Sequence, residues 1–230
     1  QHTMIVNLQN ITKSFSISED APRRTVLNDL SFQMVEGESV AILGPSGSGK
    51  TTMLNLIGSL DHPDSGKILF RDKNIVDLSP AELDNFRNQE IGFIFQFHHL
   101  LPQCSLLENV LIPTLVLADK NEKKQKLAQA EKLLKRVGIW DHKDKLPGKL
   151  SGGECQRAAV VRAMINNPSI LLADEPTGAL DKENVGIIAD LLMDLNQNDG
   201  LSLLIVTHSQ ELASRMNKTY ELVNGKPVLK

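Results

Sequence analysis

A short glycine-rich segment constrains this chain more than any other feature. An apolar run from Val40 to Leu43 precedes it, and a helical pattern from Thr51 to Leu60 follows it. The apolar run is typical of a buried parallel strand. The segment itself has the P-loop pattern, with glycines and a Lys-Thr pair at fixed places, in the order Gly44, Pro45, Ser46, Gly47, Ser48, Gly49, Lys50 and Thr51. A strand, a loop of this pattern and a helix together predict a phosphate site, because the curled backbone turns N–H groups towards phosphate oxygens.

The same segment predicts a nucleoside triphosphate as ligand. Lys50 is expected to reach the β- and γ-phosphates, and the Thr51 hydroxyl to ligate Mg²⁺. Thr52, the next residue, belongs to the same expected nucleotide-binding set. The alternative is a glycine-rich turn that binds no ligand.

Acidic and histidine side chains follow the other buried strands of the chain. Asp174 and Glu175 end the apolar run that starts at Ile170, and His208 follows the run from Leu201 to Val206. Carboxyl ends of parallel strands meet at one edge of a sheet, where α/β proteins bind ligands. Asp174 is therefore expected to face the metal, Glu175 to act as general base on the attacking water, and His208 to bond the γ-phosphate. The alternatives are acids that cap the next turn and a structural histidine.

The order of the predicted elements indicates an α/β fold with a P-loop NTPase (RecA-like) core and a mainly parallel sheet. Antiparallel β structure is expected at the N-terminus, with strands at Ile5–Ile11 and Leu30–Met34 around a loop at Ser16–Thr25. Hairpins are expected at residues 67–76 and 220–229. Helices are expected at 184–196 and 210–216.

The middle of the chain is expected to be a helical insertion, residues 78–158, within one domain of residues 1–230 whose core is formed by 1–77 and 159–230. Ser79, Pro80 and Glu82 together predict a helix start with a capping box. Residues 122–137 predict an amphipathic helix. Its apolar stripe consists of Leu127, Ala130, Leu134 and Val137.

Composition narrows the class of protein further. Lys and Arg number 25 against 28 Asp and Glu, a net charge of -3, which argues against a general nucleic-acid binder. The 2 cysteines, Cys104 and Cys155, exclude a disulfide scaffold. No apolar run approaches the ~18 residues of a membrane span, and no secretory signal is visible, so any membrane spans are expected from another chain.

A second motif, Leu150-Ser151-Gly152-Gly153-Glu154, opens a helix expected to run to about Asn166. A serine and bare N–H groups at a helix N-terminus form a second anion site. The motif resembles the signature sequence of ABC ATPases, and the resemblance extends over essentially the whole chain. It rests on an ordered set: Phe15, the P-loop, Gln96, the signature, Asp174-Glu175, Asp181 and His208.

The resemblance implies ATP and Mg²⁺ as cofactors and a head-to-tail homodimer formed on ATP binding. In such a dimer, Ser151, Gly152, Gly153 and Glu154 would contact the neighbour's γ-phosphate. Phe15 would stack on adenine, unless it is a core residue. Gln96 would sense Mg²⁺ and the γ-phosphate, and Asp181 would lie in the loop that crosses the dimer interface.

A closer resemblance is to the LolD/MacB/FtsE group of ABC ATPases, and within it to the lipoprotein-release branch. It rests on Phe97-His98-His99-Leu100-Leu101-Pro102, Asn55-Leu56-Ile57-Gly58-Ser59-Leu60-Asp61 and Ala173-Asp174-Glu175-Pro176-Thr177-Gly178. It implies two separate transmembrane permease subunits and a peripheral position on the cytoplasmic face of a bacterial inner membrane. ATP-driven closure would there move periplasmic parts of the partner. The alternatives are a MacB-like exporter, an FtsE-like regulatory module and a soluble ABC protein of DNA repair or translation.

The chain departs from the family at Cys155, where a large polar residue is usual, and at Ala179, where asparagine is usual. His98, His99 and Cys104 suggest a metal site, but a structural role or a partner contact is the favoured interpretation. The segment from Gly92 to Leu111 is rich in apolar residues. Phe93 and Phe95 are expected to pack inward, whereas Phe97 to Pro102 is expected to be exposed and to contact the permease.

Overall fold

The computed structural model describes residues 3–16 and 22–230. Its centre is a six-stranded sheet in the order β10-β9-β3-β8-β7-β6. The strands are β3 (Ser39–Leu43), β6 (Ile91–Ile94), β7 (Ile170–Asp174), β8 (Ser202–Val206), β9 (Lys218–Val223) and β10 (Lys226–Leu229). All pairs are parallel except β10 with β9. Every residue of β3 and β8 is buried, which confirms the prediction of parallel strands from continuous apolar runs.

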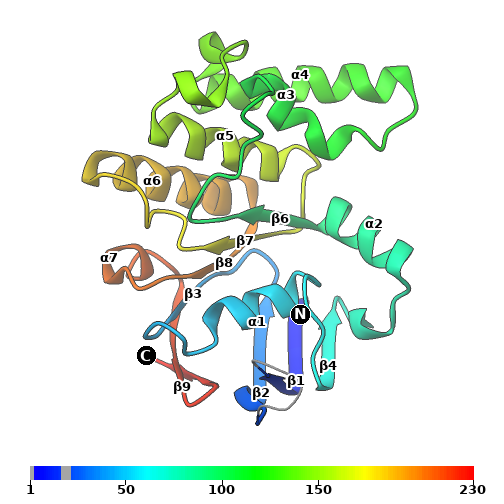
Figure 1. The fold of residues 1–230 in the computed structure, drawn as a ribbon, viewed down its shortest axis with the longest axis vertical. Helices are drawn as coiled ribbons and strands as arrows, with labels where there is room; N and C mark the ends of the chain where they lie inside the picture. The colour runs from blue at the N-terminus through cyan, green and yellow to red at the C-terminus, as the bar shows by residue number, and fades with distance from the viewer. Residues whose placement is uncertain (1–2, 17–21) are drawn as a thin grey trace.

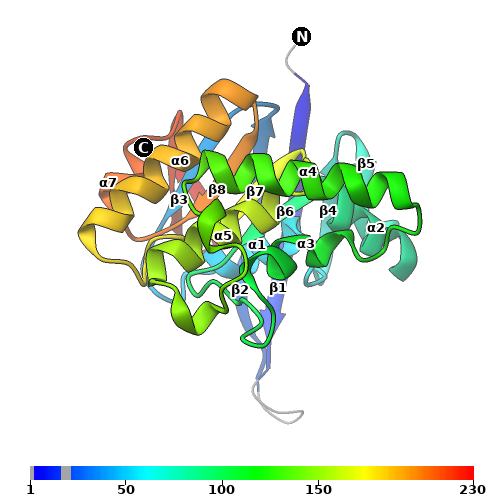
Figure 2. The ribbon, with the colours of Figure 1, turned by 90° about the horizontal axis from the view of Figure 1, so that it is seen from above.

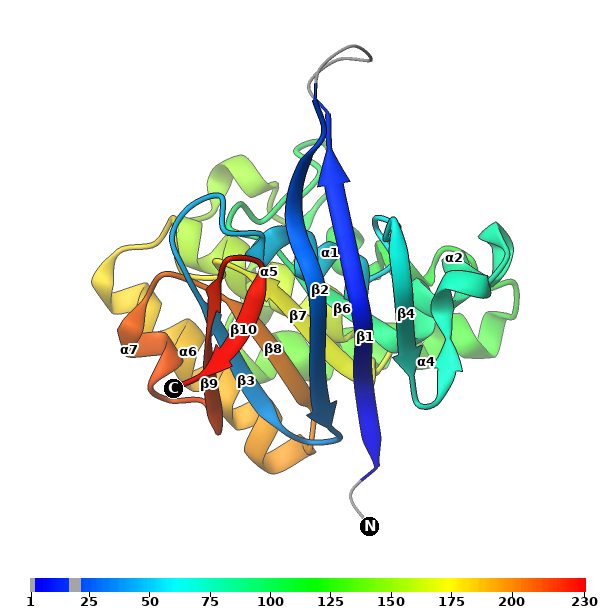
Figure 3. The same ribbon diagram turned by 90° about the horizontal axis from the view of Figure 1, so that it is seen from below.

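A four-stranded antiparallel sheet in the order β2-β1-β4-β5 packs beside it. It consists of β1 (Met4–Phe15), β2 (Arg24–Val35), β4 (Ser65–Phe70) and β5 (Lys73–Asn74). Figure 3 shows β1 and β2 running side by side as the longest pair of the sheet. The predicted loop at Ser16–Thr25 is wrong at its end, because Arg24 and Thr25 pair with Phe15 and Ser14. Residues 17–21 of that loop lie outside the described residues.

The hairpin predicted at residues 67–76 is wrong in its second strand. β5 stops at Asn74, and a 3-10 turn (Ile75–Asp77) replaces the expected continuation. The Asn74 side chain causes this, since it accepts hydrogen bonds from the N–H groups of Val76 and Ile68. A side chain that satisfies these donors favours a turn over a ladder.

Helices cover the six-stranded sheet and form a separate layer at one end of the molecule (Figure 1). Those near the sheets are α1 (Lys50–Ile57), α2 (Pro80–Glu90), α6 (Lys182–Asp199) and α7 (Gln210–Ala213). The end layer consists of α3 (Leu106–Leu111), α4 (Lys120–Arg136) and α5 (Gly152–Met164), with 3-10 turns at 112–114, 140–142 and 147–149. Seen from above in Figure 2, α4 lies across α3 and α5. The helix predicted at 210–216 is shorter than expected, because α7 ends at Ala213.

Capping and packing explain the helices of the middle segment. Ser79 and Glu82 form the predicted capping box of α2, and Ser105 and Glu108 form another at α3. On α4, Ala130 and Leu134 are buried as predicted, but Leu127 is 44% exposed. Periodicity places Leu127 on the same stripe, whereas the neighbouring helices cover only the later part of that stripe.

Residues 78–158, expected to be a helical insertion, also contain the strand β6. This strand joins the main sheet beside β7, because its apolar residues pair with Ile170–Ala173 far along the chain. The division of the chain into a core and a helical subdomain stays a prediction.

Three apolar clusters hold the layers together. One fills the space between the two sheets and α1, and includes Ile42, Met53 and Leu204. A second lies on the other face of the main sheet against α6, and a third joins α3, α4 and α5. Among the described residues, no helix is long and apolar enough to cross a membrane.

Candidate nucleotide-binding site

A cavity of about 750 Å³ opens at the carboxyl ends of β3, β7 and β8. It collects most of the residues that the sequence places at a nucleotide. Its lining consists of Phe15, Pro22, Arg24, Val26, Gly44, Pro45, Ser46, Gly47, Gly49, Lys50, Thr51, Thr52, Gln96, Asp174, Glu175 and His208. The structure therefore brings together, in one cavity, segments that are far apart in the chain.

The loop between β3 and α1 has the shape that its glycines permit. Gly49 is the N-cap of α1 in the left-handed region, with a φ of 102°. A Cβ there would lie 2.8 Å from the Leu27 side chain, so both the conformation and the space require glycine. No side chain caps α1 and no acid lies in its first turn. Its first N–H groups thus keep the capacity to bind an anion.

Lys50 folds back over the loop. Its Nζ donates to the carbonyls of Gly44 at 2.8 Å and Pro45 at 3.0 Å, and the residue is buried. The Ser48 hydroxyl is also buried, without a hydrogen-bond partner among the described residues. A buried ammonium held only by carbonyls and an orphaned hydroxyl both suit a phosphate as the missing partner.

Thr51 and Asp174 meet at the floor of the cavity. The Thr51 hydroxyl donates to Asp174 Oδ2 at 2.9 Å, although the residues are 123 positions apart. Burial raises the pKa of Asp174, partly offset by the Thr51 hydrogen bond, and the Glu175 charge raises it further. The Asp174 carboxylate and the Thr51 hydroxyl are oxygen donors of the kind that Mg²⁺ prefers. A cation bound beside Asp174 would stabilise its charged form, which burial disfavours.

Glu175 is held in a strained position beside His208. Its φ is 46°, in the left-handed region that is uncommon for non-glycine residues. Its carboxylate accepts hydrogen bonds from the Thr207 hydroxyl at 2.8 Å and from the His208 N–H at 3.2 Å. His208 Nδ1 lies 2.8 Å from the other carboxylate oxygen. This network fixes the carboxylate at the edge of the cavity.

Gln96 and Phe15 both line the cavity. The Gln96 side chain lies against Gly178, where a Cβ would come within 3.1 Å of its Nε2. Phe15 is half-exposed at the rim, with Lys13 Nζ 5.0 Å from the centre of its ring. The alternative of a core phenylalanine is therefore wrong, and a role in stacking stays a prediction.

The signature residues lie outside this cavity. Ser151, Gly152, Gly153, Glu154 and Asp181 are absent from its lining. Ser151 caps α5 by accepting from Glu154 N–H at 3.2 Å, and Glu154 accepts from Ser151 N–H at 2.6 Å. One chain thus presents two separate candidate anion sites.

Asp181 is linked to the signature through Asn184. Asp181 caps α6, and its carboxylate accepts from both the N–H and the carboxamide of Asn184. The Asn184 carboxamide in turn lies so close to Gly153 that a Cβ there would sit 1.8 Å from its Oδ1. Gly153 is therefore required by the close packing of α5 on the start of α6.

The apolar residues on either side of Gln96 differ in exposure. Phe97 is 64% exposed and Leu101 42% exposed, as predicted, whereas Leu100 is buried in the helical layer. Phe93 and Phe95 stack on each other and are only half-buried, so the prediction that they pack inward holds in part. Together with Ile112 and Pro113 they line a groove of about 430 Å³.

The departure at Cys155 and the pair of His98 and His99 each have a local explanation. Cys155 is buried in the helical layer, which suits an apolar residue, and burial raises the pKa of its thiol. The carbonyls of His98 and His99 accept hydrogen bonds from Arg162. This contact gives the pair a structural role.

Sequence reasoning missed several residues of the site. Thr207 is buried next to His208, and its position after a buried strand was a usable signal. Pro22, Arg24 and Val26 reach the cavity from the start of β2, and no motif marks them.

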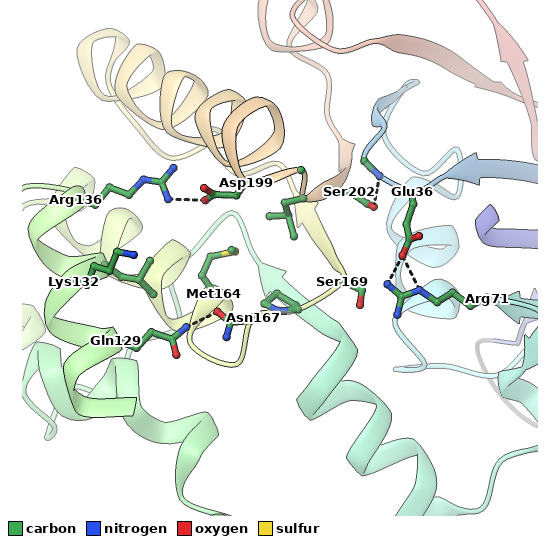
Figure 4. A pocket seen from close by; sticks show the side chains of 15 residues that line it. Glu36, Arg71, Gln129, Lys132, Arg136, Met164, Asn167, Ser169, Asp199 and Ser202 are labelled. Carbon is green, nitrogen blue, oxygen red and sulfur yellow. Dashed lines mark hydrogen bonds and ion pairs between the residues drawn. The ribbon is translucent and has the colours of Figure 1, made fainter. Parts of the chain in front are cut away.

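A second cavity, of about 780 Å³, lies at the amino ends of the strands (Figure 4). Its arginines are already paired, Arg71 with Glu36 and Arg136 with Asp199. It has no glycine-rich loop, so the carboxyl-end cavity is the better phosphate site.

Comparisons with known proteins agree with this geometry. The sequence model of the ABC transporter family matches residues 27–178. A lipoprotein-releasing system ATP-binding protein LolD from Syntrophus aciditrophicus is 45% identical over 224 residues, which cover 97% of this chain and 99% of that protein. A LolD protein from Idiomarina loihiensis is 43% identical and covers 96% of this chain and 95% of its own length.

Solved structures show the same arrangement of elements. The dimeric ATP-binding cassette MJ0796 in a post-hydrolysis state, bound to ADP and Pi, has a TM-score of 0.85 at 36% identity. The match covers 97% of this chain and 96% of that one. Another dimeric structure of MJ0796, described as a bacterial ABC transporter cassette, has a TM-score of 0.87 at 38% identity, with coverage of 97% and 96%.

Proposed function

The chain belongs to the ABC transporter family of ATP-binding proteins, and on that premise we propose that it drives lipoprotein release from a bacterial inner membrane. It has the ABC cassette fold and is an ATP-hydrolysing subunit homologous to LolD. The similarity, over nearly the full length, to proteins named for lipoprotein release is the observation that supports this proposal.

The cavity residues divide the chemistry of hydrolysis between them. The P-loop N–H groups and Lys50 bind the phosphates, with Lys50 exchanging its two carbonyl partners for phosphate oxygens. Thr51, Asp174 and Gln96 would hold Mg²⁺, which supplies positive charge against the phosphate oxygens. Glu175 accepts a proton from the attacking water as general base, in the orientation that Thr207 and His208 give it.

His208 and Phe15 complete the proposed contacts with ATP. Because His208 Nδ1 faces Glu175, its Nε2 is the ring nitrogen available to the γ-phosphate. Phe15 stacks on adenine from the rim of the cavity.

Two copies of the chain are proposed to enclose two ATP molecules. The support is that each chain carries a signature outside its own cavity, so a second copy in head-to-tail orientation can supply it. The dimeric state of the MJ0796 cassettes fits this arrangement. Ser151, Gly152, Gly153 and Glu154 would then face the partner's γ-phosphate, with Asp181 at the interface.

A pair of LolC/LolE-like permease subunits is the proposed membrane partner, which places the chain on the cytoplasmic face of the membrane. The groove lined by Phe93, Phe95 and Pro113, with exposed Phe97 and Leu101 nearby in sequence, is the proposed docking surface. Exposed apolar side chains gathered at one surface favour a protein contact.

The test is purification of the chain with membrane proteins retained, followed by reconstitution of the recovered complex in liposomes that contain a lipoprotein. We expect a permease pair and ATP-dependent release of the lipoprotein to a soluble acceptor. The same complex with Glu175→Gln is the control and should release none. Recovery of a one-chain exporter or of cell-division proteins, without release, would replace the proposal by the MacB-like or FtsE-like alternative.

A further inference from the structure

A buried glutamine on α5 connects three parts of the site. Gln156 is 1% exposed, and its Nε2 donates to the Phe95 carbonyl at 3.0 Å and the Pro176 carbonyl at 2.8 Å. Both N–H donors of the carboxamide are therefore used. The side chain spans from α5 to two loops of the main sheet, 61 and 20 positions away in the sequence.

The two carbonyls belong to residues next to proposed functional side chains. Phe95 directly precedes Gln96, and Pro176 directly follows Glu175. α5 itself begins at the signature serine, Ser151. One carboxamide thus ties the signature helix to the segment of Gln96 and to the segment of Glu175.

Both carbonyls lie where the sheet no longer holds the backbone. β6 ends at Ile94, so the Phe95 carbonyl is beyond the paired part of the strand. Pro176 has no N–H, and backbone bonds from Glu175 N–H to the Val206 carbonyl and from Gly178 N–H to the Glu175 carbonyl form this turn. The bond from Gln156 to the Pro176 carbonyl then ties the turn to α5. Buried carbonyls need a donor, and Gln156 is the one that reaches both.

We propose that Gln156 is a positioning residue that couples the two ATP sites of the dimer. Through Pro176 and Phe95 it acts on Glu175 and Gln96, which serve the chain's own ATP. Through α5 it is rigidly connected to Ser151, which serves the partner's ATP. Closure of the signature on the partner's γ-phosphate is thereby linked to the placement of the general base. This inference rests on the proposed ATP-driven dimer.

The experiment replaces Gln156 by methionine, which has a similar length but no donor. Gln129→Met is the matched control, because Gln129 also joins a helix of the end layer to the core, through Asn167 in the second cavity (Figure 4). The full-length chain is used, and ATP affinity, the rate of hydrolysis against ATP concentration and thermal unfolding are measured for each variant.

We expect Gln156→Met to bind ATP as the wild type does, because the P-loop is untouched. Its kcat should fall roughly 10- to 100-fold, the range for a catalytic group displaced by about 1 Å. The Hill coefficient for ATP should fall towards one, because the two sites no longer act together. Gln129→Met should retain the wild-type kcat and Hill coefficient, even if its melting temperature changes.

A second variant gives a readout that a merely structural role would not move. Gln156→Glu keeps the shape, and when protonated it can donate one hydrogen to a carbonyl. Burial raises the pKa of such a carboxyl group, so its rate relative to the wild type should rise as the pH falls. The charged side chains around this position, Glu154, Arg157, Glu175 and His208, are present in both proteins, so the rate is compared as the ratio of variant to wild type at each pH. Gln156→Glu also tests the proposal if the methionine variant does not fold.

The outcomes separate the inference from the proposed function. A Gln156 variant that folds, binds ATP and hydrolyses it with wild-type kcat and cooperativity overturns the coupling. A lower melting temperature with unchanged kinetics also overturns it, because the role would then be structural alone. A wild-type chain that stays monomeric with ATP would instead contradict the dimer on which the inference rests, and a wild-type dimer without cooperativity would overturn the coupling itself.

Discussion

Helices α1 and α5 both begin at a candidate phosphate site, but their first turns are built differently. α1 starts at Gly49, has no side-chain cap and has no acid in its first turn. α5 starts at Ser151, has a complete capping box and carries Glu154 in its first turn. His142 Nδ1 lies 2.6 Å from the Glu154 carboxylate, outside the hydrogen bonds of the capping box.

The difference indicates which site binds ATP first. At α1 the N–H groups and the positive end of the dipole are available to phosphate. At α5 a carboxylate already lies near the dipole, and it repels a further anion. We infer that α1 binds ATP by itself and that α5 contacts only a phosphate already held by the P-loop of a partner chain.

Glu175→Gln should leave binding at α1 intact and remove the general base. Turnover should fall by roughly 10²–10⁴, and an ATP-bound dimer should accumulate. The measurements are ATP affinity, steady-state hydrolysis in the membrane complex and the oligomeric state with ATP. Wild-type turnover would remove Glu175 from the mechanism.

Ser151→Arg should disable the α5 site and spare the α1 site. A bulky cation at this position blocks the approach of the partner's γ-phosphate, so hydrolysis should fall roughly 10²-fold because the reacting groups are no longer aligned. Nucleotide should still bind, since Lys50 and Gly47 are unchanged. A variant that stays monomeric with ATP and hydrolyses it at the normal rate would show that α5 takes no part.

Leu101→Asp should leave both helix starts unaffected and weaken only the contact with the permease. Burying a carboxylate without a partner costs about 2 kcal/mol or more, which lowers the affinity roughly 30-fold. The isolated chain should remain folded and bind ATP. The measurement is recovery of the complex from detergent, and unchanged recovery with normal release would place the contact elsewhere.

Glu154→Gln should have the smallest effect on the protein, and it changes the capping box of α5 itself. Hydrogen bonds from the Ser151 N–H and hydroxyl, with His142 and Arg157 nearby, hold the pKa of Glu154 below its ordinary value of 4.5 despite some burial. A carboxyl with a lowered pKa stabilises the fold above its ordinary pKa, and this contribution is lost as the pH falls below it. The variant should therefore lose about 0.3–1 kcal/mol of stability at neutral pH, and the loss should vanish in acid.

The same variant should also make ATP-driven dimerisation tighter, because one negative charge leaves the α5 site. Glu82→Gln is the control, since α2 has the same capping box far from the cavity. Chemical unfolding across pH and dimerisation with ATP give the two readouts. Equal dimerisation for both variants and the wild type would contradict the proposed repulsion at α5.

Elements with local signals could be predicted from the amino-acid sequence alone. The apolar run before Gly44 and the segment Gly44–Thr51 predicted the strand, the phosphate loop and the start of the helix. These signals are local, because glycine conformations and helix dipoles act over a few residues. The Ser79 capping box was readable for the same reason. The edge that holds Asp174, Glu175 and His208 also followed, since parallel strands share a carboxyl end.

Contacts between segments far apart in the chain could be seen only in the folded structure. The hydrogen bond of Thr207 to Glu175, the two bonds of Gln156 and the place of β6 beside β7 each join distant segments. The exposure of Leu127 depends on how far its neighbours cover α4. No local pattern encodes these features, because a buried polar group is satisfied by whichever partner the packed layers bring to it.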